Sequence, residues 1–226
     1  MKKLITSAIA AITVMALSLS AQAATKYKIG DIYDVDGLKG VVVAVDASGE
    51  HGTIMTIEHS SEKWCSDKDQ KFDTNLFYED DGQKNMKLLA SYIEESGSSW
   101  ADYPLFNWAR SLGEGWYIPA KDEVLQVWKN INGGSETYSK KAFKAFGKIL
   151  KKSKGDGLID NRPYIGTKQP WWWLTSTEGD GGQVYVVQFG NDFKSQITVG
   201  FHSTFKAFLI KKTYSQAVRS RAFHKF

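Results

Sequence analysis

Three consecutive tryptophans, Trp171, Trp172 and Trp173, are the most distinctive candidate ligand-binding residues in the sequence. Exposed indole rings stack on the apolar faces of sugar rings, and neighbouring polar groups fix the ligand's orientation. On a β-strand, Trp171 and Trp173 share one face and Trp172 takes the other, so at least one ring must pack inward. The cluster therefore fits either a sugar-binding surface or an ordinary core.

A second candidate is a group of lysines in residues 140–152. Apolar residues recur there at helical spacing, and six lysines occupy the other face: Lys140, Lys141, Lys144, Lys148, Lys151 and Lys152. The simplest interpretation is a solvated cationic face above a core-facing stripe. The alternative is a patch that binds acidic polysaccharide or anionic lipid, with Lys144, Lys148 and Lys151 as the residues in contact.

Oxygen-bearing side chains in two turns raise the question of calcium binding. These are Glu178, Asp180, Asn191 and Asp192. Calcium needs several oxygen ligands, but turn residues chosen for backbone geometry explain the same positions. No two histidines have the spacing of a zinc site. The sequence therefore leaves calcium open and predicts no cofactor.

Cys65 is the only cysteine, so an internal disulfide is excluded. A lone thiol in an oxidising compartment is usually buried, and an intermolecular bridge is the alternative. His51 or His59 can approach Cys65 in space, but no activating motif surrounds it, and we expect a protein that is not an enzyme. The rival hypothesis is an enzyme using acids from residues 59–82 or 178–192.

The N-terminus has the organisation of a secretory signal peptide. Two lysines precede an apolar run from Leu4 to Leu17, and Ala21-Gln22-Ala23 forms a small-x-small cleavage site. The run is short for a membrane span, and no cysteine follows it to accept a lipid. We therefore expect residues 1–23 to be removed, and residues 24–226 to form one periplasmic or extracellular domain without a membrane anchor. A formal net charge of only +4 argues against a nucleic-acid partner.

The elements that must position these residues form three blocks. Short β-branched runs between glycine-containing turns predict an antiparallel meander over residues 27–58, and the polar residues 59–82 predict a long surface excursion. Apolar periodicity predicts four helices, near residues 84–96, 104–112, 121–131 and 140–152. Strands are expected again at 171–175, 183–189, 193–199, 204–211 and 217–223. This order predicts an α+β fold with antiparallel sheets and several packed helices.

Four segments in these blocks occur in the order of a known family. Leu112–Val124 resembles an L-GxGW-xLPT-xxEL signature, and Trp173–Glu178 looks like YWSSTE. Val184–Asn191 is similar to an xYVVxFxNG strand and turn, and Val218–Phe223 looks like VRAVRAF. Together they resemble the C-terminal domain family of the Lcl collagen-like adhesin. The resemblance implies an exported domain of C-type-lectin-like fold, related to the fold of the formylglycine-generating enzyme.

The resemblance also sets expectations for single residues. The related enzymes act through two cysteines late in the chain, and none follows Cys65 here. Ala120 replaces the threonine that would cap a helix while Glu123 remains, so we expect a different cap at this helix start. Glu178 is expected to pair with Arg219 or Arg221.

The leading hypothesis is a non-enzymatic binding or adhesion module that recognises a glycan or a cell-surface protein. A structural subunit of a surface appendage is a further alternative.

Overall fold

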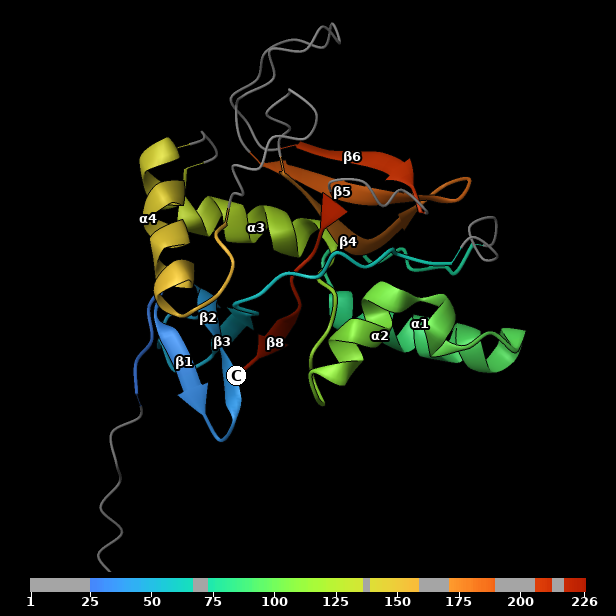
Figure 1. Cartoon of the computed structure of the whole chain (residues 1–226), viewed down its shortest axis with the longest axis horizontal. Coiled ribbons are helices and arrows are strands. Elements are labelled where there is room, and N and C mark those ends of the chain that lie inside the picture. Colours follow the sequence, from blue (N-terminus) through green and yellow to red (C-terminus); the bar gives the residue numbers. More distant parts are fainter. Residues whose placement is uncertain (1–24, 67–72, 136–138, 159–170, 190–205, 213–217) are drawn as a thin grey trace, which may run out of the picture.

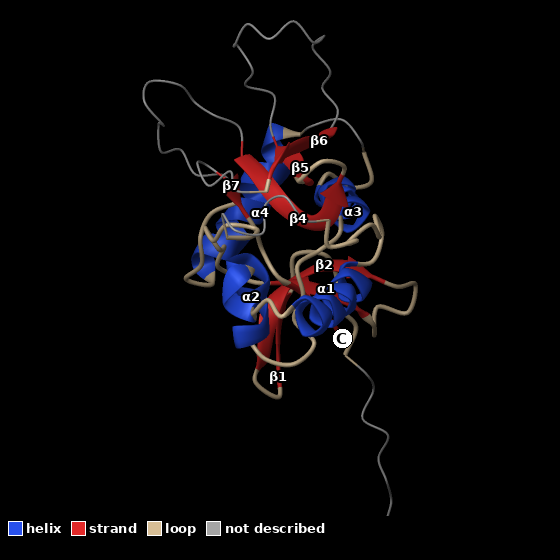
Figure 2. Cartoon of the chain, turned by 90° about the vertical axis from the view of Figure 1, so that its right-hand side faces the viewer, coloured by secondary structure: helices blue, strands red, loops and turns tan. Residues whose placement is uncertain are grey.

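The computed structural model describes residues 25–66, 73–135, 139–158, 171–189, 206–212 and 218–226. The predicted signal peptide and the predicted strand at 193–199 lie outside these ranges. The described chain is mixed α+β, with two mainly antiparallel sheets and packed helices, which confirms the predicted α+β class. In both views the second sheet lies above the first (Figures 1 and 2).

The first sheet contains the predicted meander and one additional strand. Its order is β1 (Ile32–Val35), β2 (Leu38–Val45), β3 (Gly52–Met55) and β8 (Phe223–Lys225). Asp36 and Gly37 connect β1 to β2 with φ values of 51° and 82°, the left-handed pair that a tight two-residue hairpin requires. β8 pairs antiparallel with β3, so the end of the chain completes the N-terminal sheet.

The second sheet has the order β6 (Lys206–Lys211), β5 (Gln183–Phe189), β4 (Trp171–Gly179) and β7 (Val218–Arg219). β4, β5 and β6 are antiparallel neighbours, whereas β7 pairs parallel with β4. The chain therefore passes from the second sheet to the first within the few residues that separate β7 from β8.

The four predicted helices are present near their expected positions: α1 (Gly82–Ser96), α2 (Pro104–Ser111), α3 (Lys121–Ile131) and α4 (Lys140–Lys152), with a short 3-10 turn, η1 (Trp100–Asp102). Gly97, with φ of 72°, ends α1 in the left-handed conformation expected after a helix. α3 contacts strands of both sheets and also α4. Its predicted apolar face, which comprises Val124, Val127, Trp128 and Ile131, is buried.

The described parts of the polar segment 59–82, namely residues 59–66 and 73–82, do not form the surface excursion that their polarity predicted. Trp64, Cys65 and Leu76 are fully buried in the core. Trp64 packs edge-on against Phe106, and its indole nitrogen donates a hydrogen bond of 3.0 Å to the carbonyl of Thr175. A few large apolar side chains thus hold an otherwise polar segment against the second sheet, and these residues are too sparse to produce a periodic pattern.

Candidate functional site

All three residues of the tryptophan cluster lie on strand β4. Trp173 is 1% exposed and packs against Trp128 at a centroid distance of 6.0 Å. Trp173 therefore serves the core. Trp171 and Trp172 belong to the same strand, but their side chains lie outside the described part of the structure.

The lysine cluster lies on one side of α4. At 100° per residue, the six lysines fall within an arc of about 120°, and all six are exposed. Phe143, Phe146 and Leu150 point to the opposite side and are buried, and Phe143 stacks on Trp128 at 4.1 Å. Ser139 caps the helix by accepting a hydrogen bond from the backbone of Ala142. α4 is therefore fixed by its apolar face, and its lysine face is turned to solvent.

Among the described residues, no acidic side chain forms an ion pair with this lysine face. α4 contains no acidic residue. Lys151 and Lys152 lie in the last turn, where the helix dipole favours positive charge. Figure 1 shows α4 at one edge of the molecule, and the six lysines on it are exposed.

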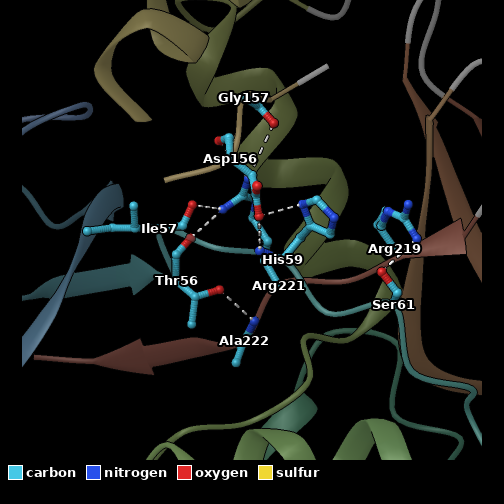
Figure 3. Close-up of polar contacts among 9 residues, drawn as sticks. All are labelled: Thr56, Ile57, His59, Ser61, Asp156, Gly157, Arg219, Arg221 and Ala222. Carbon is cyan, nitrogen blue, oxygen red and sulfur yellow. Dashed lines mark hydrogen bonds and ion pairs between the residues drawn. The ribbon is translucent and has the colours of Figure 1, made fainter. Parts of the chain in front are cut away.

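A buried arginine anchors the loop that follows α4 (Figure 3). Arg221 donates hydrogen bonds to the carbonyl oxygens of Thr56, Ile57 and Asp156. Burial lowers the pKa of Arg221 to about 10, with Asp156 acting in the opposite direction, so the guanidinium stays charged at neutral pH. The Asp156 carboxylate faces His59 Nδ1 at 2.9 Å. Local sequence carries no signal for this network, because its members are far apart along the chain.

The expected pairing of Glu178 with Arg219 or Arg221 is wrong. Glu178 forms a buried ion pair with Lys212, and its other carboxylate oxygen accepts hydrogen bonds from Thr74. Arg219 instead donates to the Ser61 hydroxyl at 2.7 Å. Glu178 lies on β4 and Lys212 directly follows β6. These two strands flank β5, so the sheet order brings the two residues together.

A hollow of about 270 Å³ lies at the start of α3, and its lining includes Asp80, Asp122 and Glu123. Burial raises the pKa of Glu123, although three hydrogen-bond donors favour its charged form. These donors are the backbone nitrogens of Ala120 and Gly82, at 2.9 and 3.0 Å, and the Tyr117 hydroxyl, at 2.8 Å. The Glu123 carboxylate therefore accepts hydrogen bonds that hold the start of α3 in place.

The start of α3 also has the different cap that the sequence predicted. Ala120 provides no side-chain hydrogen bond to the helix. Instead, the Thr177 hydroxyl on β4 accepts a hydrogen bond of 2.9 Å from the backbone of Lys121. The same hydroxyl donates to the carbonyl of Tyr78, so a single threonine connects the helix, the sheet and the preceding loop.

The structure places two of the four candidate calcium ligands, and it also places Cys65. The Glu178 carboxylate forms an ion pair with Lys212 and accepts a hydrogen bond from Thr74. Asp180 is exposed in a turn, and Asn191 and Asp192 lie outside the described residues. In the described ranges, no three His, Cys, Asp or Glu side chains are arranged to hold a metal ion. Cys65 is buried and not in a disulfide, as expected for a structural thiol.

The lysine face of α4 is thus the candidate site that the described side chains support best. Among the described helices, none is long and apolar enough to cross a membrane. Comparison with known proteins finds no matching family model, no matching curated protein and no matching solved structure.

Proposed function

We propose that the chain is an exported, non-enzymatic binding or adhesion protein whose α4 lysine face binds an acidic polysaccharide. The observation that carries the proposal is the concentration of six exposed lysines on a helix without any acid. Such a surface raises the local concentration of anionic ligands. The resemblance of four segments to the Lcl C-terminal domain family supports export, adhesion and a C-type-lectin-like form of the α+β fold.

The burial of the other face of α4 favours a polysaccharide over a lipid bilayer. A helix that lies in a membrane interface inserts its apolar side between lipids. In α4 that side packs on α3 and is buried through Phe143, Phe146 and Leu150. Binding must then depend mainly on charge, along a helix of about 20 Å. An extended polyanion matches this geometry, and its affinity should fall as salt screens the lysines.

Three acids of residues 59–82 and 178–192, namely Glu79, Asp81 and Glu178, are engaged in structural contacts. Glu178 is bound by Lys212 and Thr74, and Asp81 caps α1 through the backbone of Lys84. Glu123 is held by three donors. These contacts support a binding protein over an enzyme that uses acids of residues 59–82 or 178–192.

The proposal is tested by salt elution from immobilised heparin, with two variants of equal charge. One carries Lys144→Gln, Lys148→Gln and Lys151→Gln, and the control carries Lys39→Gln, Lys87→Gln and Lys225→Gln, which are exposed lysines outside α4. We expect the α4 variant to elute at much lower salt than the wild type, and the control to elute close to the wild type.

Equal elution of the two variants would show that net charge alone is responsible and would exclude α4 as the site. Failure of the wild type to bind heparin or other acidic polysaccharides would refute the proposed ligand class. Binding to phosphatidylserine vesicles without binding to polysaccharide would favour the lipid alternative.

A further inference from the structure

Phe77 is the most exposed large hydrophobic residue in the described part of the chain. Its exposed fraction is 61%, whereas the other large hydrophobic residues that are exposed range from 37% to 40%. Phe77 lies between β3 and α1, in a loop whose alternate residues Thr74 and Leu76 are buried. The ring contributes to neither core cluster, so packing does not explain its presence.

The backbone on the N-terminal side of Phe77 is held by Glu178. The carboxylate of Glu178 accepts a hydrogen bond of 2.8 Å from the backbone of Thr74, and its own N–H donates to the carbonyl of Leu76 at 2.8 Å. Between them, Asn75 adopts a left-handed φ of 59°. The Phe77 N–H then donates to the Asn75 carbonyl, which forms a tight turn.

The backbone on the C-terminal side is held by Asn85, a fully buried residue of α1. Its amide accepts from the Tyr78 N–H at 3.1 Å and donates to the Tyr78 carbonyl at 2.7 Å. Leu76 is hydrogen-bonded to the backbone of Glu178 and Tyr78 to the side chain of Asn85, so the backbone on both sides of Phe77 is held in place. Such preorganisation lowers the entropic cost of binding.

Tyr78 and Lys84 extend the surface around Phe77. The rings of Phe77 and Tyr78 have centroids 5.0 Å apart and planes inclined by 30°. The Lys84 ammonium lies 5.0 Å from the centroid of the Tyr78 ring. Exposed carboxylates follow directly at Glu79, which also pairs with Lys121 at 2.7 Å, and at Asp80. We call these two rings and their charged neighbours the Phe77 surface.

We propose that the Phe77 surface is a second binding site, which stacks on the apolar face of a neutral sugar ring. A pyranose has one face rich in C–H groups and a rim of hydroxyls. The aromatic rings suit the apolar face, and Glu79, Asp80 and Lys84 suit the hydroxyls. Glu79 and Asp81 are paired with Lys121 and Lys84, whereas Asp80 has no ion pair among the described residues and would disfavour an anionic sugar, so this ligand differs from the one proposed for α4.

The dimensions of the surface favour a sugar over a protein partner. Stable protein interfaces bury about 800 Å² per partner, and their centres are depleted of charged residues. The Phe77 surface offers two adjacent rings, with carboxylates one and two positions after Tyr78. A single pyranose ring is small enough to stack on one or two aromatic side chains.

The test is native affinity electrophoresis of the full chain in gels that contain hydroxyethylcellulose, laminarin, galactomannan or soluble starch. We expect at least one of these neutral polysaccharides to retard the wild type. Phe77→Ala should weaken the retardation about fivefold or more, because aromatic stacking is lost. Phe77→Trp should preserve it. Leu112→Ala, which removes another exposed apolar side chain at the end of α2, should leave it unchanged.

The outcomes of this experiment distinguish the Phe77 surface from the lysine face of α4. Retardation that survives added sodium chloride and the Lys144, Lys148 and Lys151 substitutions supports two independent sites. No retardation of the wild type by any of the four polysaccharides would overturn the proposal, whatever the heparin result. Equal retardation of the wild type and Phe77→Ala, with the same melting temperature, would also overturn it.

Discussion

The ion pair between Glu178 and Lys212 makes the strongest stability prediction, because it is buried below the loop that carries Phe77. The side chain of Lys212 is 0% exposed and that of Glu178 is 5% exposed. The Lys212 ammonium also lies 4.9 Å from the ring centroid of Trp64. Glu178→Gln keeps the size of the side chain but removes its charge, so the Lys212 ammonium loses its buried carboxylate.

The expected magnitude follows from this burial. Removing one partner of a buried ion pair costs about 3–5 kcal/mol, because the remaining charge stays out of water. The hydrogen bonds from Thr74 are less affected, because the glutamine carbonyl still accepts them. We therefore expect Glu178→Gln to lower the free energy of unfolding by about 3 kcal/mol. Adding Lys212→Met removes the buried charge and should restore about 1 kcal/mol or more.

The assay is urea unfolding at neutral pH, followed by tryptophan fluorescence and circular dichroism. The exposed pair of Asp34 and Lys39, with side chains 56% and 52% exposed, provides the control. Asp34→Asn should cost less than about 1 kcal/mol. The reasoning would be refuted if Glu178→Gln cost no more than this control, or if the double variant were no more stable than Glu178→Gln alone.

Three further predictions concern the contacts that position α3 and α4. Burial raises the pKa of Glu123 above its ordinary value of 4.5, so the contribution of this group to stability is complete below pH 4.5 and is lost as pH rises through the native pKa. Glu123→Gln should therefore reduce the fall in melting temperature between pH 4 and pH 7, and an unchanged pH profile would contradict this assignment. Arg221→Lys should lower the free energy of unfolding by about 2 kcal/mol, because one ammonium cannot replace the fork of donors; Arg219→Lys is the control and should cost less. Thr177→Val should cost about 1 kcal/mol and speed hydrogen exchange at the Lys121 amide, and unchanged exchange there would exclude the cap.

The helices could be predicted closely because their signals are local. The apolar stripes in residues 121–131 and 140–152 repeat at 3.6 residues, and both helices have the predicted bounds. Gly97 ends α1 in the left-handed conformation. The lysine face of α4 could be predicted for the same reason, because the positions of the apolar residues determine which side of the helix remains in solvent.

The burial of Trp64, Cys65 and Leu76 within the polar residues 59–82 could not be predicted from composition. The few apolar side chains of this segment, such as Trp64 and Leu76, show no period, and the buried acceptors for its polar groups come from residues about a hundred positions later. Phe77 was missed for a related reason. Nothing in the local sequence distinguishes an outward-pointing phenylalanine from its buried neighbour Leu76, and only the hydrogen bonds to Glu178 and Asn85 decide between them.

The sequence by itself determined the four helices, the N-terminal meander and the cationic side of α4, because periodicity and turn residues act over a few positions. The single strand predicted at 217–223 is instead two strands, β7 and β8, in different sheets. Tertiary structure decided the pairing of β8 with β3, the partner of Glu178 and the cap that Thr177 provides for α3. It also decided that Trp173 lies in the core while Phe77 faces solvent. These features depend on contacts between segments far apart in the chain, and no local propensity encodes which segments meet.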